Sequence, residues 1–132
     1  MIFFKNLGFS TGARGERAAA KYLKQHGYRI IARNLRSRMG EIDIVAQASD
    51  RRTIVIVEVK TRAIEDAGVA GILPEEHVNR QKQRKLAALA SQLVNRYRLE
   101  DRPIRFDVIG VDLVARGTPV IRHYEGAFES FF

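Results

Sequence analysis

Cysteine is absent from this chain of 132 residues, and its three histidines show no metal-ligand spacing, so a solvent or packing role is expected for each. Disulfides, thiolate zinc sites and cysteine nucleophiles are therefore excluded, which fits a reducing compartment. Long apolar runs are also missing. The apolar start, residues 1–4, is followed at once by Lys5 and is too short for a signal peptide or a membrane span. We expect a cytoplasmic protein with no membrane partner.

Composition indicates one globular domain over residues 1–132, because the chain is long enough to bury a core and is 45% hydrophobic and 29% charged. Internal repeats, low-complexity tracts and glycine-rich phosphate loops are absent. Residues 1–11 are expected to be a loosely held N-terminus. Residues 63–77 contain two glycines, a proline and several charges, which predicts a long loop that is either a flap over a site or a disordered insertion.

The net charge of +8 is unevenly distributed along the chain. Residues 1–38 carry nine basic side chains and one acidic, whereas residues 39–77 carry four basic and eight acidic. Residues 78–105 carry eight basic and two acidic. An acidic centre flanked by basic segments is expected of a phosphate-binding surface around a metal site. A solvated basic exterior is the alternative interpretation of the charge alone.

Two arms rich in β-branched residues, 40–46 and 53–62, are separated by polar residues, which is the pattern of a β-hairpin. The second arm is a nearly continuous apolar run, typical of a strand covered on both faces. Glu58 and Lys60 interrupt this run two residues apart, so their side chains lie on the same face. Because charges cost stability there unless they are paired or bound to something, we expect function at this point.

The length of the hairpin turn decides which side chains meet. With a two-residue turn or a four-residue loop at residues 49–52, opposed residue numbers sum to 101, so Asp43 lies across from Glu58 and Glu41 across from Lys60. A three-residue turn would send Asp43 and Glu58 to opposite faces. Asn-Gly and Asp-Gly are absent from the turn, so we favour the four-residue loop. Two adjacent carboxylates repel, and a hard divalent cation with oxygen ligands relieves that repulsion.

A first helix is predicted to begin after Thr11 and Gly12 and to end at Gln25 or His26, with Gly27 as its C-cap. One stripe at helical spacing is Ala13, Glu16, Ala19, Ala20 and Leu23. Glu16 is the only acid among the first 38 residues. It is either a member of the site or a first-turn acid that favours the helix dipole.

A second helix is predicted from about Asn79, a candidate N-cap, to Tyr97. Its buried stripe would be Leu86, Leu89, Ala90, Leu93 and Tyr97. Four basic residues crowd its first turns: Arg80, Lys82, Arg84 and Lys85. Cations there oppose the helix macrodipole, so phosphate binding explains them better than helix stability does. Arg36 and Arg38, just before the hairpin, are either further phosphate contacts or an exposed basic turn without function.

Three more strands are predicted over residues 28–36, 103–111 and 120–124, and Asp107 within the second of these is expected to be structural. The element order is then helix, three strands, helix, two strands. A strand–helix–strand crossover makes the third and fourth strands parallel and right-handed. The predicted fold is an α/β sandwich with α+β connectivity, in which helices flank a mixed five-stranded sheet. The apolar tail at residues 128–132 is expected to dock onto the body or a partner.

These residues resemble the PD-(D/E)xK nuclease superfamily, with its restriction-endonuclease-like core, in an acid on the first helix (Glu16), an acid on the second strand (Asp43) and Glu58-Val59-Lys60 on the third. Within it, residues 15–19, 40–46, 57–62 and 106–108 resemble the small bacterial YraN family, which is described as endonucleases similar to archaeal Holliday-junction resolvases. The likeness covers roughly residues 12–128. Ile42 departs from it by standing where the superfamily name has proline, and the loop at 63–77 looks longer than usual.

The resemblance implies that Asp43 and Glu58 bind Mg²⁺ or Mn²⁺ with the Val59 carbonyl, that Lys60 orients or activates the attacking water, and that Glu16 is an additional acid of the site. The expected nucleic-acid contacts are Arg36, Arg38, Arg62, Arg80, Lys82, Arg84 and Lys85. The implied activity is hydrolysis of DNA phosphodiester bonds, including branched or junction DNA. A resolvase-like role would require two active sites and hence a homodimer.

Two alternatives remain open from the sequence. The chain would be a non-catalytic nucleic-acid-binding protein that keeps the nuclease fold if no divalent ion binds and no DNA is cut. It would be neither a nuclease nor a nucleic-acid-binding protein if Lys60 only forms ion pairs with Glu58 and Glu41 on a sheet face. This last interpretation leaves Asp43 unpaired, and buried ion pairs are weak evidence for stability.

Overall fold

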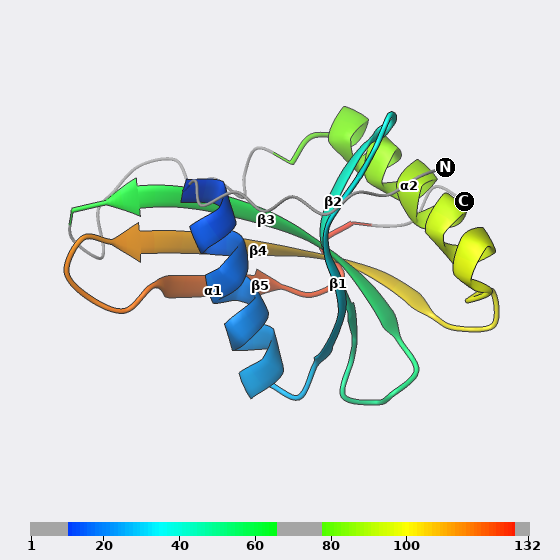
Figure 1. Cartoon of the computed structure of the whole chain (residues 1–132), viewed down its shortest axis with the longest axis horizontal. Coiled ribbons are helices and arrows are strands. Elements are labelled where there is room, and N and C mark those ends of the chain that lie inside the picture. Colours follow the sequence, from blue (N-terminus) through cyan, green and yellow to red (C-terminus); the bar gives the residue numbers. More distant parts are fainter. Residues whose placement is uncertain (1–10, 66–77, 129–132) are drawn as a thin grey trace.

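The computed structural model describes residues 11–65 and 78–128, which form two helices and one mixed sheet (Figure 1). In chain order the elements are α1 (Thr11–Gln25), β1 (Arg29–Ser37), β2 (Gly40–Gln47), β3 (Ile54–Ile64), α2 (Arg80–Tyr97), β4 (Ile104–Val114) and β5 (Val120–Tyr124). The strands lie in the order β1-β2-β3-β4-β5, and β3 and β4 are parallel while the other neighbours are antiparallel. The predicted αβββαββ order and mixed five-stranded sheet are confirmed.

Local signals set the helix ends where they were predicted. Gly27, with φ +87°, follows α1 in a conformation that favours glycine. The Asn79 side chain caps α2 by accepting a hydrogen bond from the Lys82 backbone N–H at 2.9 Å. Neither α1 nor α2 is long and apolar enough to cross a membrane. Residues 1–10 of the predicted loose terminus and residues 66–77 of the predicted loop lie outside the described residues, whereas Thr11 begins α1 and β3 extends through Ile64.

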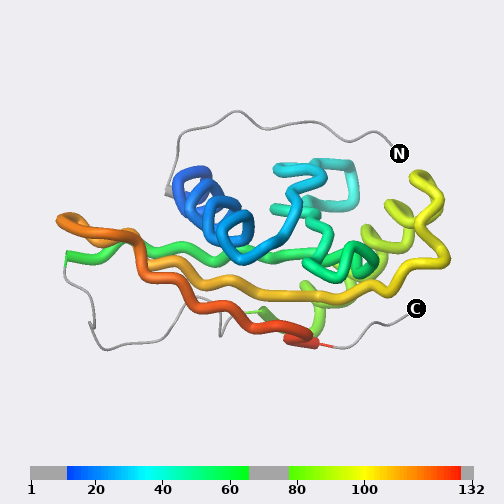
Figure 2. Tube along the Cα trace, turned by 90° about the horizontal axis from the view of Figure 1, so that it is seen from below, coloured from blue at the N-terminus to red at the C-terminus, as the bar shows by residue number. Residues whose placement is uncertain are grey.

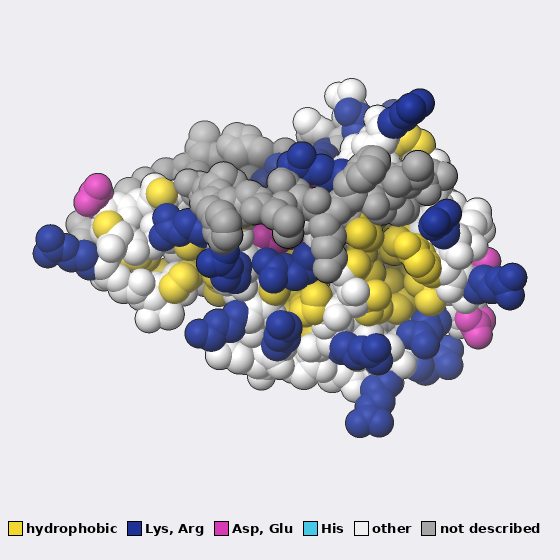
Figure 3. Space-filling model, in the orientation of Figure 1, with side chains coloured by type: hydrophobic (Ala, Val, Ile, Leu, Met, Phe, Trp, Pro, Cys, Tyr) yellow, Lys and Arg dark blue, Asp and Glu magenta, His cyan; other side chains and the backbone are white. Residues whose placement is uncertain are grey.

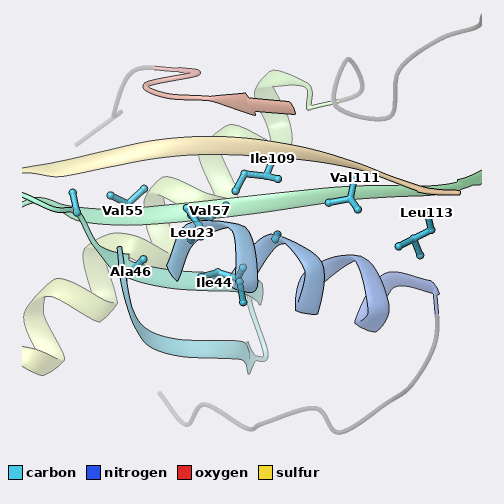
Figure 4. Close-up of a cluster of buried hydrophobic side chains, with 11 residues drawn as sticks. Leu23, Ile44, Ala46, Val55, Val57, Ile109, Val111 and Leu113 are labelled. Carbon is cyan, nitrogen blue, oxygen red and sulfur yellow. The ribbon is translucent and has the colours of Figure 1, made fainter. Parts of the chain in front are cut away.

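Each helix covers apolar residues of the sheet, and β3 serves both layers. Val55 and Val57 belong to the buried cluster under α1, whereas Ile54 and Ile56 belong to the cluster under α2. This alternation confirms that β3 is covered on both faces. Figure 2 shows α1 lying along one side of β3 and β4, and Figure 4 shows Leu23 of α1 among the strand side chains that it covers.

Two expectations were wrong, one about a core residue and one about the end of a strand. Tyr97 was expected to be buried but is 54% exposed, because the buried residues of α2 end at Leu93 and its last turn runs past the apolar cluster. β4 was expected to end at Val111 but runs to Val114. The buried Asp112 looks like a strand breaker in the sequence, yet it is accommodated because Arg62 and Arg122 both donate hydrogen bonds to its carboxylate.

Candidate active site

The turn between β2 and β3 is the predicted four-residue loop. The Ala48 backbone N–H donates to the Thr53 carbonyl at 2.9 Å and closes residues 49–52. The Asp50 carboxylate holds the loop by accepting hydrogen bonds from the backbone N–H groups of Arg52 and Thr53. The ladder that follows pairs Gln47 with Ile54 and continues to the Ile44–Val57 pair. The predicted register, in which opposed numbers sum to 101, is therefore confirmed.

This ladder ends immediately before the two predicted metal ligands. Asp43 and Glu58 are the next residues on β2 and β3, where the strands are no longer paired to each other. The Asp43 Oδ2 atom instead accepts a hydrogen bond from the Val59 backbone N–H at 2.7 Å. A carboxylate thus replaces a strand partner at the point where β2 leaves β3, and Asp43 is held beside Glu58.

Glu58 is buried and receives two ammonium groups on one of its oxygens. Lys60 Nζ lies 3.3 Å from Glu58 Oε1, and Lys82 Nζ of α2 lies 3.6 Å from the same atom. The other oxygen, Oε2, is buried and has no hydrogen-bond partner. The side chains of Lys60 and Lys82 remain 30% and 31% exposed, so the cationic side of the site reaches solvent.

Glu16 reaches this cluster from α1. Its carboxyl is buried, interacts with the Asn34 backbone N–H, and leaves Oε1 without a partner. Burial raises the pKa of Glu16 to about 7, and the charges of Glu41 and Glu58 add to the rise while Arg33 opposes it. The position of α1 depends on Gly15, because a Cβ atom there would overlap the Thr61 side chain of β3. The signal that sequence reasoning missed is this glycine inside a helical pattern.

The pKa of Asp43 is raised by burial and by the acids around it. Burial raises the pKa of Asp43 well above its ordinary value, and repulsion from Glu58 and then from Glu16 raises it further. The hydrogen bond from Val59 opposes this rise without cancelling it. Acids from α1 and β3 therefore disfavour the charged form of Asp43, which is an arrangement typical of functional sites.

The predicted nucleic-acid contacts divide into three groups. Lys82 turns inward to Glu58, while Arg80, Arg84 and Lys85 lie exposed on the first turns of α2. Arg38 lies exposed in the turn between β1 and β2, and Arg36 pairs with Glu41 at 3.2 Å. Arg62 lies apart from the cluster, bound to Asp112 through two hydrogen bonds. The inward direction of Lys82 had no signal in the sequence beyond its place near the start of α2.

The chemistry of this donor set fits a small divalent cation. Among residues 11–65 and 78–128, no three acidic or histidine side chains are placed to hold a metal ion together. Mg²⁺ is usually held by one or two carboxylates and keeps several waters, so Asp43, Glu58 and the Val59 carbonyl suffice. The partnerless Glu58 Oε2 offers a free coordinating atom, and the raised pKa of Asp43 shows that the charged form of this carboxyl would be favoured by a nearby cation. Two grooves, of about 330 and 420 Å³, lie away from this cluster.

The similarity of this chain to known proteins covers most of its length. A family model described as "Uncharacterised protein family UPF0102" matches residues 15–111. A UPF0102 protein of Pelobacter propionicus is 43% identical over 91% of this chain and 83% of its own length. Those of Symbiobacterium thermophilum and Alkaliphilus oremlandii are 46% and 47% identical, over 91% and 89% of this chain and 97% and 96% of their own lengths.

One solved structure is distantly similar. The chain of Pyrococcus furiosus SfsA in complex with Ca²⁺ is 13% identical, with a TM-score of 0.31, over 86% of this chain and 61% of that chain. A likeness of this strength supports no inference about function.

Proposed function

The chain belongs to the uncharacterised protein family UPF0102, and from its own side chains we propose that it is a Mg²⁺- or Mn²⁺-dependent endonuclease acting on DNA. One observation carries the proposal. Asp43 and Glu58 converge from neighbouring strands with Lys60 Nζ 3.3 Å from Glu58, and a buried Glu58 oxygen is left without a partner. The same family was expected from the resemblance of the motifs to YraN proteins.

A purely structural role explains this cluster poorly. A buried polar atom without a partner costs about 1–3 kcal/mol, and both Glu58 and Glu16 have such an atom. Repulsion among the carboxylates adds to that cost. Such an unfavourable arrangement is understandable if a bound ligand satisfies the carboxylates. A divalent cation would supply both positive charge and coordination to the Asp43–Glu58 pair.

The roles of the side chains follow from their positions. Asp43, Glu58 and the Val59 carbonyl would hold the metal, which when bound would polarise the phosphodiester and make a coordinated water more acidic. Lys60 would orient the attacking water and stabilise the negative charge that develops on the phosphoryl oxygens. Lys82, which shares Glu58 Oε1 with Lys60, would fix that carboxylate from the α2 side. Glu16, with a pKa of about 7, would hold or release a proton near neutral pH.

The charge distribution supports DNA as the substrate. In the sequence, the acidic segment 39–77, which contains Asp43 and Glu58, lies between a basic segment that includes α1 and β1 and the basic first turns of α2. Lys and Arg side chains that neutralise phosphates supply most sequence-independent affinity for DNA. We include branched DNA in the proposal on the strength of the motif resemblance, and a resolvase-like role on junctions would require two active sites and hence a homodimer.

A non-catalytic nucleic-acid-binding protein is the second candidate. The observation in its favour is that two lysines already share Glu58 Oε1, so that this carboxylate is neutralised without a metal. Such a protein would bind DNA in a salt-dependent manner and would cut none.

A cleavage panel separates the two candidates. Junction, flap, linear and single-stranded DNA are incubated with Mg²⁺ or Mn²⁺ and either the wild type, Asp43→Ala or Lys60→Ala, while the mass of the protein in solution is measured. We expect the wild type to cut and both variants to lose at least about 10²–10³-fold in rate while they still bind DNA. Metal-dependent cleavage that survives Asp43→Ala contradicts the assignment, and binding without any cleavage by the wild type favours the second candidate.

A further inference from the structure

The outer face of α1 presents basic side chains without an acidic one. Arg14, Arg17 and Lys21 recur at intervals of three and four residues, which places them on one face of the helix. The one acid of α1, Glu16, lies on the opposite, buried stripe. In Figure 3, dark blue Lys and Arg side chains gather over the part of the molecule where Figure 1 shows α1.

A groove runs beside this basic face. It has a volume of about 420 Å³ and lies between α1 and the connected ends of β4 and β5. Its α1 wall includes Arg14, Arg17 and Lys21, and its other wall includes Leu113, Pro119 and Ile121. We call it the α1 groove. It offers cations along one side and an apolar surface along the other.

Side-chain hydrogen-bond contacts connect the two walls of the α1 groove. The Tyr22 hydroxyl of α1 lies 3.2 Å from His123 Nδ1 of β5, and His123 Nε2 lies 2.7 Å from a carboxylate oxygen of Asp107 on β4. Asp107 is fully buried and also accepts two hydrogen bonds from Arg105. This chain of contacts ties α1 directly to β5 and, through His123, to β4, so a ligand meets a groove that is already formed.

We propose that the α1 groove binds the sugar–phosphate backbone of DNA and thereby extends the substrate contacts of the catalytic cluster around α1; the choice of DNA rests on the proposed function. The cations match backbone phosphates, and the apolar wall matches the sugars between them. With a helical rise of about 1.5 Å per residue, Arg14 and Lys21 are about 10 Å apart along the helix axis, which is close to the rise of three base-pair steps of about 3.4 Å along the axis of a DNA duplex.

The position of α1 links the groove to the catalytic cluster. Glu16 lies on the inner side of the helix and contributes to the cluster, whereas the neighbouring Arg17 lines the groove on the outer side. A DNA strand bound along the groove is therefore led past the same turn of α1 that supplies an acid to the site. The sequence pointed to α2 and the β1–β2 turn for DNA contacts, and the α1 groove adds a third surface.

The salt dependence of DNA binding tests this proposal independently of cleavage. Binding of a fluorescent DNA duplex is measured in EDTA at several salt concentrations for the wild type and for two double variants. The groove variant is Arg14→Ala/Lys21→Ala. The control, Arg51→Gly/Arg96→Ala, removes the same charge from exposed positions elsewhere, and Gly suits the positive φ of Arg51 (64°).

The groove variant is expected to lower the slope of log K against log salt by about 2 and to weaken binding at least about tenfold near 0.1 M salt. The control is expected to change the slope by less than about 0.5. Equal losses in both variants, or an unchanged slope in the groove variant, would overturn the proposal. So would a groove variant that loses binding to phosphatidylglycerol vesicles but not to DNA, because lipid would then be the partner. If the slopes differ as expected but the wild type cuts no DNA, the groove stands and the nuclease proposal fails.

Discussion

Two groups of buried carboxylates lie on this sheet, and they differ in what surrounds their oxygens. Asp107 accepts hydrogen bonds from Arg105 and the Gly126 backbone N–H and contacts His123, and Asp112 accepts from two arginines. In the candidate site, by contrast, Glu16 and Glu58 each keep a buried oxygen without a partner. Glu16, Glu58, Asp107 and Asp112 are all buried, so burial alone does not separate the two groups.

The pKa values of Asp107 and Asp112 shift in the opposite direction from those of Glu16 and Asp43. Hydrogen bonds from Arg62 lower the pKa of Asp112 to about 2 and, with those from Arg122, outweigh the effect of burial. Burial alone would raise the pKa of Asp107, but its hydrogen bonds hold it below the ordinary value. Burial raises the pKa of both Glu16 and Asp43, and neighbouring acids raise it further.

This contrast distinguishes carboxylates that stabilise the fold through hydrogen bonds from carboxylates whose oxygens are left available to a ligand. A buried carboxylate with a full set of donors stabilises its charged form and ties elements together. A buried carboxylate with empty oxygens and like-charged neighbours costs stability, and such conflicts concentrate where proteins bind or react. By this criterion Asp107 and Asp112 are structural, and Glu16, Asp43 and Glu58 are the residues that we propose for the site.

The largest expected difference in stability separates Asp112 from Asp43. Asp112→Ala leaves Arg62 and Arg122 without their shared carboxylate and should lower the free energy of unfolding by about 2–4 kcal/mol. Asp43→Asn keeps an oxygen for the Val59 N–H and removes the repulsion from Glu58, so it should leave that free energy unchanged or raise it by up to about 1 kcal/mol. Urea denaturation at pH 7 in EDTA measures both, and equal destabilisation would erase the contrast.

A methyl group at Gly15 tests how the cluster is assembled. Gly15→Ala places a Cβ atom against the Thr61 side chain and must move α1 away from β3. Overpacking of this kind costs about 1–3 kcal/mol, and the movement also displaces Glu16. The denaturation midpoint should fall, and Gly15→Ala/Thr61→Ala should recover most of the loss. No recovery in the double variant would indicate that α1 is positioned by other contacts.

The smallest effect is the part of the pH dependence of stability that Glu16 contributes. Its pKa is about 7 in the folded protein against 4.5 ordinarily, so it favours folding below pH 4.5 and loses that contribution as pH rises through 7. Glu16→Gln should therefore match the wild type in stability near pH 4.5 and exceed it by about 1–2 kcal/mol near pH 8. Thermal unfolding in EDTA at both pH values measures this, and a difference independent of pH would contradict it.

Sequence reasoning predicted those features of this molecule that depend on local pattern. The even number of residues in the β2–β3 loop gave the register that brings Asp43 beside Glu58. The two-residue spacing of Glu58 and Lys60 placed both side chains on one face. The N-cap at Asn79 and the turn at Gly27 followed from the conformational preferences of those residue types.

Features that depend on tertiary partners were not predictable in this way. The continuation of β4 through Asp112 requires Arg62, which lies 50 residues away in the chain. The inward turn of Lys82 requires the placement of α2 against β3, and the exposure of Tyr97 requires knowing where the apolar cluster ends. The packing of Gly15 against Thr61 likewise depends on how closely the finished helix approaches the sheet.

Mn²⁺ binding tests the central claim most directly, because it asks whether the unsatisfied carboxylates are a metal site without requiring any substrate. Electron paramagnetic resonance of free Mn²⁺ is measured during titration with the wild type, Asp43→Asn and Asp112→Asn, each shown to be folded by circular dichroism. The wild type and Asp112→Asn are predicted to bind Mn²⁺ alike, and Asp43→Asn is predicted to lose that binding. Binding that persists unchanged in Asp43→Asn, or no binding by the folded wild type, would contradict the account.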